Sequence, residues 1–158
     1  MRTARIREFR RWRVRAVGQS LSPPRGVPLS IDERKPRPFH FEIGQKLTPL
    51  RDEGVLIVGS GNLVHNLESY ARGRHPHGPY DWALRFENVA NELILAGDLQ
   101  PLIDYESLGP DAALAIPTPD RYLPLLYILA AGQPSKRVQF PVDGVDGGPI
   151  SMLAVQIG

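Results

Sequence analysis

The hydrophobic pattern of the chain predicts helices alternating with strands. Residues 54–59 form a continuous apolar run, Gly-Val-Leu-Ile-Val-Gly, which Ser-Gly-Asn closes. A run of this length, rich in β-branched residues, is typical of a strand buried on both faces, and the glycines after it predict a loop. Residues 39–50 are predicted to form an amphipathic helix before it, because their apolar positions recur at helical spacing: Phe39, Ile43, Leu47 and Leu50.

Further helices and strands are predicted along the rest of the chain. Residues 79–95 and 99–108 have helical patterns that end at glycine. A third helix is predicted over 119–131, with Thr118 as its N-cap and an irregularity at Pro124, which lacks an amide hydrogen. The β-rich runs at the end of the chain, joined by a glycine-rich loop, are expected to complete the sheet of an α/β fold: residues 137–142 and 150–157.

Composition limits the chemistry available to the chain. Its 158 residues, 42% of them hydrophobic, fit one domain with a sizeable core. The absence of cysteine excludes disulfides, cysteine zinc sites and thiol nucleophiles, so a metal would need His, carboxylate or water ligands. The sequence contains no apolar run of membrane-spanning length and no signal-peptide core, so we expect a cytoplasmic protein without membrane partners.

The first 28 residues differ from the remainder in charge. They carry eight Arg against one acid, Glu8, whereas residues 29–158 carry 11 basic and 16 acidic side chains. An Arg- and Pro-rich segment of this kind predicts a poorly ordered arm ahead of a single domain over 29–158. The clustered arginines beside Trp12 are compatible with binding nucleic acid or an acidic membrane surface. A solvated tail is the preferred interpretation, and nucleic-acid binding ranks lowest.

His65 is the leading candidate site residue. It follows the Gly-Ser-Gly-Asn loop that ends the apolar run, and ligands gather where buried strands end. Glycines let the backbone approach a ligand closely, and imidazole can bind a metal or move a proton near neutral pH. A hydrogen-bonded structural histidine remains the alternative. The loop lacks both a P-loop and a Gly-x-Gly-x-x-Gly motif, so nucleotide binding is disfavoured.

Other candidates lie at the start of the 119–131 helix and in loops. Arg121 is suited to a carboxylate and Tyr122 to donating a hydrogen bond, but a solvated arginine and a core tyrosine fit the sequence equally well. His40 lies off the apolar stripe of its helix, which predicts a surface position. His75 and His77 have no third ligand nearby and are expected to be loop residues.

Four ordered blocks resemble one known family: residues 51–67, 80–83, 117–127 and 151–158. They are similar to the C-terminal half of the class III extradiol ring-cleavage dioxygenases, in the 4,5-DOPA extradiol dioxygenase branch. The resemblance implies an α/β fold with a central sheet and flanking helices, a zinc or non-haem Fe(II) ion held mainly by histidines, and O₂-dependent opening of a catechol ring.

The resemblance also implies roles for individual residues. In the family, the histidine at the position of His65 is a metal-site or acid/base residue. Independently of this family role, Asn62, Arg121 and Tyr122 are our candidate substrate-binding residues. The family has histidine where this chain has Arg121, and guanidinium cannot replace imidazole as a ligand or base.

A second departure concerns length. The family's first metal-binding histidines lie in an N-terminal half that the resemblance does not cover, so a lone chain is expected to bind metal poorly and to be weak or inactive. The composition break near residue 28 favours a truncated or frameshifted reading of a longer gene. An exposed sheet edge then predicts low stability or self-association into homo-oligomers. The alternative function is a non-catalytic domain that binds a small phenol or anion.

Overall fold

The structure is a computed structural model that describes residues 26–72, 78–132 and 136–158. Most of the predicted arm, and both His75 and His77, lie outside these described residues. The helices are α1 (Arg37–Asp52), α2 (Leu67–Arg72), α3 (Asp81–Ala96), α4 (Gln100–Ile103), the 3-10 turn η1 (Tyr105–Leu108), α5 (Pro110–Ala115) and α6 (Leu123–Ala131). The strands are β1 (Val138–Val142), β2 (Val145–Asp146), β3 (Ile150–Ser151) and β4 (Ala154–Ile157).

The strands form two small antiparallel ribbons. β1 pairs with β4, placing Val138 opposite Ile157, and the register shifts before Val142 opposite Ala154. Pro141 lies within that irregular stretch, and proline cannot donate a ladder hydrogen bond. β2 and β3 pair as a hairpin between them. The mixed helix and strand content confirms the predicted α/β class, although the expected strand over 150–157 is interrupted between β3 and β4.

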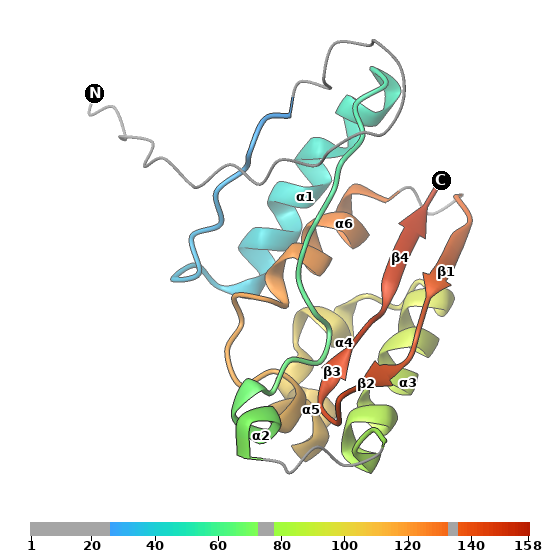
Figure 1. Cartoon of the computed structure of the whole chain (residues 1–158). Helices are drawn as coiled ribbons and strands as arrows, with labels where there is room; N and C mark the ends of the chain where they lie inside the picture. The colour runs from blue at the N-terminus through green and yellow to red at the C-terminus, as the bar shows by residue number, and fades with distance from the viewer. Residues whose placement is uncertain (1–25, 73–77, 133–135) are drawn as a thin grey trace, which may run out of the picture.

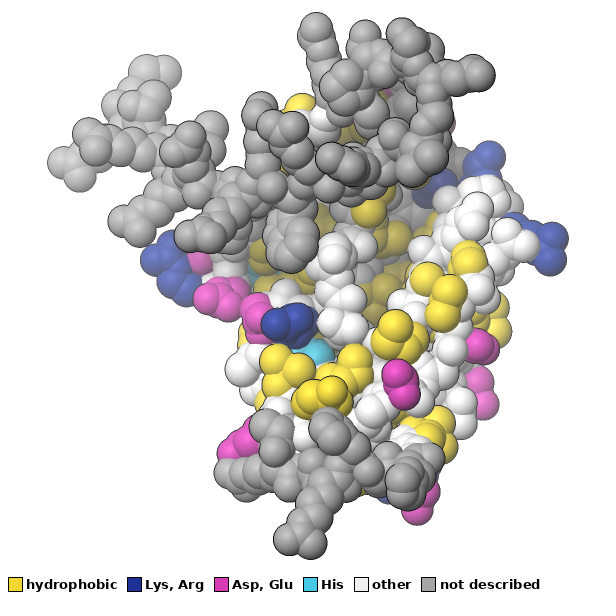
Figure 2. Space-filling model, viewed as in Figure 1, with side chains coloured by type: hydrophobic (Ala, Val, Ile, Leu, Met, Phe, Trp, Pro, Cys, Tyr) yellow, Lys and Arg dark blue, Asp and Glu magenta, His cyan; other side chains and the backbone are white. Residues whose placement is uncertain are grey.

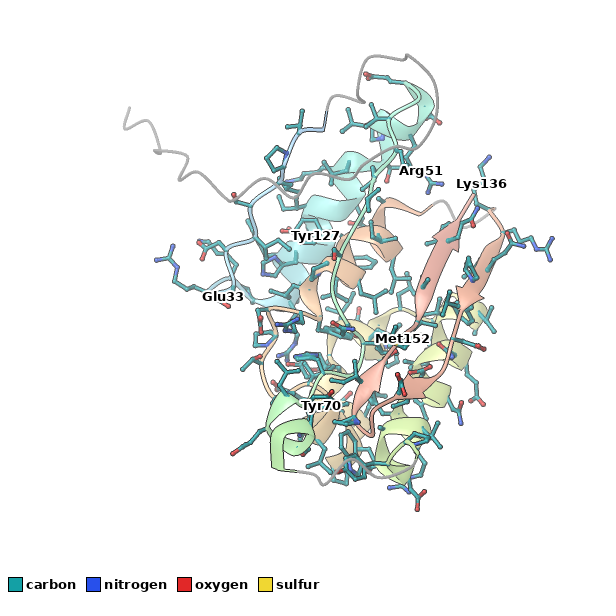
Figure 3. The ribbon with its side chains drawn as sticks, in the orientation of Figure 1. Glu33, Arg51, Tyr70, Tyr127, Lys136 and Met152 are labelled. Carbon is teal, nitrogen blue, oxygen red and sulfur yellow. The ribbon has the colours of Figure 1, made fainter. Side chains whose placement is uncertain are left out.

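α6 lies between α1 and the helices of the core (Figure 1). Almost every residue of α6 is apolar, as expected for a helix covered on more than one side. The principal core cluster combines residues of α3, α4, α5 and α6 with the loop after the glycines, and its largest fully buried members include Tyr122, Leu102, Leu123 and Leu126. Tyr127 on α6 lies against α1 (Figure 3).

The predicted buried strand at residues 54–59 is wrong. The segment is extended, but it pairs with no strand of the described residues. Val55, Leu56 and Val58 are 46%, 85% and 76% exposed. An apolar run indicates what a segment can bury, but its burial also requires neighbouring strands. The ribbon of β1 and β4 pairs internally and leaves this segment uncovered on one side (Figure 1).

His40 is fully buried, so its predicted surface position is also wrong. Its ring nitrogens lie 3.0 Å from the Tyr127 hydroxyl and 3.2 Å from the Lys35 carbonyl oxygen. The face of α1 that contacts α6 is centred on Gly44, one helical turn after His40, and both are buried. The buried face of α1 is therefore the face on which Gly44 lets α6 approach closely, and not the face of the apolar stripe.

The helix predicted over 119–131 begins later, at Leu123. Pro124 therefore occupies its first turn, where no amide hydrogen is needed, and introduces no irregularity. Thr118 donates its hydroxyl to Asp120 instead of capping the helix. The helices α1 and α3 match their predictions closely, and α3 ends at Gly97 in the left-handed conformation as expected.

Replacing Gly44 by alanine is expected to separate α1 from α6. The new Cβ atom would lie 2.7 Å from both the Ala130 Cβ and the Tyr127 carbonyl oxygen. Overpacking of this kind costs about 1–3 kcal/mol, partly offset by the better helix propensity of alanine, about 1 kcal/mol. Urea denaturation should show a net loss of up to about 2 kcal/mol in the free energy of unfolding. The exposed α1 variant Gln45→Ala is the control, and an equal effect of the two would contradict the close packing.

Candidate functional site

His65 lies in a buried loop that backbone hydrogen bonds fix in place. Its amide donates to the Ala115 carbonyl oxygen, and its backbone forms an isolated antiparallel bridge with Ile150. The loop before it places Leu63 and Val64 in the core. Because the chain enters the core here, His65 is only 3% exposed.

Both nitrogens of the His65 ring face backbone carbonyl oxygens. Nε2 lies 2.8 Å from the Thr118 oxygen, and Nδ1 lies 3.2 Å from the Asn62 oxygen. Carbonyl oxygens only accept hydrogen bonds, so a neutral ring with one N–H makes one of these bonds and a doubly protonated ring makes both. In this arrangement the ring links the glycine loop to the segment before α6.

Asn66 is a structural residue that the sequence analysis missed. Its side-chain oxygen accepts a hydrogen bond from the Ser69 amide at 2.8 Å, so Asn66 caps the unpredicted helix α2. Its side-chain nitrogen donates to the Leu114 carbonyl oxygen at 2.9 Å and joins this corner to α5. An asparagine before Leu-Glu-Ser is a recognisable N-cap signal, which could have revealed the helix.

Asn62 and Arg121 are brought together at one cavity. The Asn62 amide donates to the Arg121 carbonyl oxygen at 2.9 Å, and the Asn62 side chain donates to the Ser151 carbonyl oxygen at 3.0 Å. The cavity, of about 270 Å³, lies between the glycine loop 59–63, the start of α6 and residues 153–155. Arg121 is exposed at this cavity, and we call it the loop cavity below.

Tyr122 points away from the loop cavity and into the core. It is fully buried, its hydroxyl donates to the Leu102 carbonyl oxygen at 2.8 Å, and its ring meets Tyr105 edge-on at 4.9 Å. Burial raises the pKa of this hydroxyl. The core alternative therefore describes Tyr122 in this structure, and Tyr122 is not among the residues that line the loop cavity.

Asp120 supplies the negative charge beside His65. The Thr118 hydroxyl donates to its carboxylate and is the main reason that the pKa of Asp120 lies below its ordinary value. Partial burial opposes this shift, and the charge of His65 adds to it. Neither Asp120 nor Thr118 was predicted from the sequence to be a partner of His65.

Removing the Thr118 hydroxyl should raise the pKa of Asp120. Because the pKa of Asp120 is lowered in the folded protein, its charged form stabilises the fold. This stabilisation is complete above the ordinary carboxyl pKa of about 4 and is lost as the pH falls through the lowered value. Thr118→Val should therefore destabilise the protein near neutral pH and reduce the loss of stability on acidification. Carboxyl NMR titration checks the pKa directly, with Thr48→Val on α1 as the control. An unchanged Asp120 titration in Thr118→Val would contradict the assignment.

The described residues do not by themselves fit a complete metal centre. Across 26–72, 78–132 and 136–158, no group of three or more His, Asp or Glu side chains is placed to hold a metal ion. The His65 ring, the expected ligand, has both nitrogens directed at carbonyl oxygens. Any metal bound here would therefore require donors from elsewhere and a change at His65.

Comparisons with known proteins identify relatives of this chain. No protein-family model matches it. The chain is 45% identical over 135 residues to an Escherichia coli K12 protein named 4,5-DOPA dioxygenase extradiol, a match that covers 84% of this chain and 49% of that protein. The Beta vulgaris protein of the same name is 31% identical over 125 residues, covering 78% of this chain and 45% of its own length.

A solved structure matches the fold as well. The crystal structure of an uncharacterized Escherichia coli K12 protein has a TM-score of 0.69 and 43% sequence identity, covering 82% of this chain and 53% of that one. The fold and these matches define the chain as a homologue of extradiol dioxygenases. Its curated homologues are named 4,5-DOPA dioxygenase extradiol, and the chain spans about half the length of these relatives.

The resemblance stated from the sequence is thereby confirmed, and the partial coverage is consistent with a match to one half of the family's fold.

The described helices do not include one long and apolar enough to cross a membrane.

Proposed function

We propose that this chain provides part of a dioxygenase that opens the ring of a DOPA-type catechol with O₂. The observation that supports it best is the loop cavity, where residues far apart in sequence meet. Asn62 and Arg121 are joined there by a backbone hydrogen bond, and the His65 ring contacts the carbonyl oxygen of Asn62. The family relationship supplies the reaction class.

The loop cavity suits a single aromatic ring. Its volume of about 270 Å³ is near the lower end of small-molecule sites, which are roughly 300–1,000 Å³. Its lining combines two glycines and several apolar residues with three polar residues: Ser60, Asn62 and Arg121. Arginine side chains bind carboxylates through paired hydrogen bonds, so the role of Arg121 in this proposal is to bind the carboxylate of an amino-acid catechol. Asn62 holds the loop in position through Ser151.

Zinc or non-haem Fe(II) is the cofactor proposed for the family reaction, but this chain's described residues do not complete its ligand set. His65 is the residue we propose to act at the metal or as an acid/base group once other donors are present. The chain by itself should accordingly turn over catechols weakly or not at all.

DOPA binding tests the substrate part of the proposal. NMR titration of the chain should give saturable shift changes at residues 59–63 and 153–155. Arg121→Gln should weaken binding about tenfold or more, because a hydrogen bond to a charged group contributes about 1.5–3 kcal/mol. Arg85→Gln is the matched control, since Arg85 pairs with Asp111 on α5 away from the cavity. Binding that is insensitive to Arg121→Gln would contradict the assigned role.

A second candidate function is binding of a small phenol or anion without turnover. Two features favour this function. Both nitrogens of the His65 ring face backbone carbonyl oxygens, and Arg121 stands where the family has a second histidine. The two functions differ in oxygen uptake. Saturable DOPA binding without DOPA-dependent oxygen uptake, in zinc- or iron-supplemented protein that contains a full-length family fold, would support the second function and exclude the first.

A further inference from the structure

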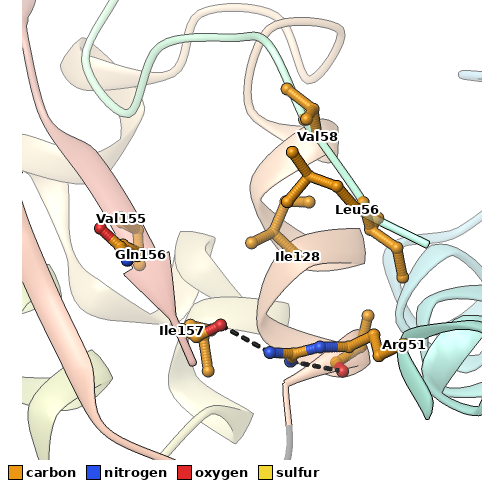
Figure 4. Close-up of a pocket in the computed structure, with 10 residues that line it drawn as sticks. Arg51, Leu56, Val58, Ile128, Val155, Gln156 and Ile157 are labelled. Carbon is orange, nitrogen blue, oxygen red and sulfur yellow. Dashed lines mark hydrogen bonds between the residues drawn. The ribbon is translucent and has the colours of Figure 1, made fainter. Parts of the chain in front are cut away.

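An apolar groove separates the extended segment 55–59 from β4. Its cavity of about 250 Å³ is lined on one side by Leu56 and Val58, on the other by Val155 and Ile157, and at its base by Ile128 of α6 (Figure 4). Hydrophobic side chains are visible along the hollow beside the extended segment (Figure 2). We call this the strand groove.

Within the part of the chain that the structure describes, both walls of the strand groove are extended backbone with no strand paired on the groove side. Among the described residues, β4 pairs only with β1, and segment 55–59 pairs with no strand. Sheet edges exposed to water usually carry charges, prolines or bulges that prevent further pairing. The sequences Val-Leu-Ile-Val at 55–58 and Ala-Val-Gln-Ile at 154–157 contain no such protection.

Arg51 lies at one end of the strand groove, where two backbone carbonyl oxygens hold its guanidinium. Its guanidinium donates to the Ala131 carbonyl oxygen at 3.1 Å and to the Ile157 carbonyl oxygen at 2.6 Å (Figure 4). The end of α1 is thereby tied to α6 and to the end of β4. Apart from Arg51 and Gln156, the residues that line the groove are apolar or glycine.

The other end of the strand groove opens towards the loop cavity. Gly59, Ile128 and Val155 line both hollows. A polypeptide lying in the groove would therefore bring its end to the place where Asn62 and Arg121 meet.

We propose that the strand groove receives an extended, apolar β-strand from the polypeptide that the relatives possess outside the matched half. The chain covers 49% of the E. coli relative and 53% of the matched crystal structure, so a comparable length of polypeptide is available there. Strand addition forms main-chain hydrogen bonds to both walls and buries the exposed side chains. Leu56 and Val58, 85% and 76% exposed, are the residues that it covers.

A second copy of this chain is a poorer occupant. The apolar extended segment that it could offer, residues 55–58, closely follows α1 on one side and leads on the other into the glycine loop, which a backbone hydrogen bond from Asn62 ties to Arg121. Such a segment can pair along one edge but cannot enter between two walls. The occupant that fits is a strand free to lie within the groove.

The test mixes the full chain with a polypeptide containing the part of the E. coli relative outside the match. We expect a one-to-one complex by light scattering, and amide hydrogen exchange slowed at least tenfold at residues 55–58 and 154–157. Leu56→Lys with Val58→Lys should weaken binding at least tenfold, since both side chains are exposed in the free chain and their replacement should not impair folding. Leu95→Lys, at a 61% exposed position on α3, is the control.

Three results would overturn the proposal: no complex, equal binding by the double variant, or a homodimer that protects the same amides. If the added polypeptide is insoluble alone, a covalent fusion to the full chain replaces it. The proposal then requires protection of residues 55–58 that is lost in the double variant, and exchange as fast as in the unfused chain would contradict it.

Discussion

Tyr122→Ala is expected to lower the free energy of unfolding by about 3–5 kcal/mol, as large-to-small replacements of buried aromatic residues do. Tyr122 is fully buried, packs edge-on against Tyr105 and donates its hydroxyl to Leu102. Tyr122→Phe keeps the ring but leaves the Leu102 carbonyl oxygen without this donor, which should cost about 1–3 kcal/mol. Urea denaturation measures both values.

The same pair of variants separates a core role from a substrate role. If Tyr122 belongs to the core, Tyr122→Phe reduces stability and leaves DOPA affinity almost unchanged. Tyr80→Phe is the control, because the Tyr80 ring stacks on Trp82 and is only partly buried. Loss of DOPA binding in Tyr122→Phe with full retention of stability would show that the hydroxyl reaches the ligand and that its placement in the core is wrong.

Gly61→Ala is the second change with a large expected effect. A Cβ atom at residue 61 would collide with the carbonyl oxygen of Arg121. That carbonyl is backbone and already accepts the Asn62 amide, so the loop must move away from the start of α6. We expect a loss of about 2–3 kcal/mol in the free energy of unfolding, within the range for overpacking, and weaker DOPA binding because the walls of the loop cavity separate.

Gly26→Ala provides the comparison for Gly61→Ala, since nothing lies within 4 Å of a Cβ atom at residue 26. It should change neither stability nor binding. A Gly61→Ala protein with unaltered DOPA affinity and stability would mean that the close approach of the loop to α6 is not required.

Helical periodicity predicted the long helices because residues three or four positions apart in sequence form the face that each helix buries. α1 and α3 are both recovered, and Gly97 ends α3 as expected. The extended segment at 54–59 was misjudged for the opposite reason, since its burial depends on strands from elsewhere. His40 shows a related limit, because the approach of two helices at Gly44 leaves no hydrophobic signal.

The site was predictable in part. The glycine loop and the residues before α6 were recognised, and the structure brings Asn62 and Arg121 of these two segments to one cavity. The partners of His65 were not foreseen, because they are backbone carbonyl oxygens and any residue type can supply them. Tyr122 was ambiguous, since the sequence does not reveal which side of the first turn faces the core.

Oxygen uptake with DOPA tests the central claim, that this chain forms one part of a catechol ring-opening site. Two zinc- or iron-supplemented proteins are compared: the chain alone, and a chimera in which residues 29–158 are joined to the part of the E. coli relative outside the match. We predict DOPA-dependent oxygen uptake by the chimera, its loss in the chimera carrying His65→Ala, and little or none by the chain alone. Equal uptake by the chain and the chimera, or full activity of the His65→Ala chimera, would contradict the account.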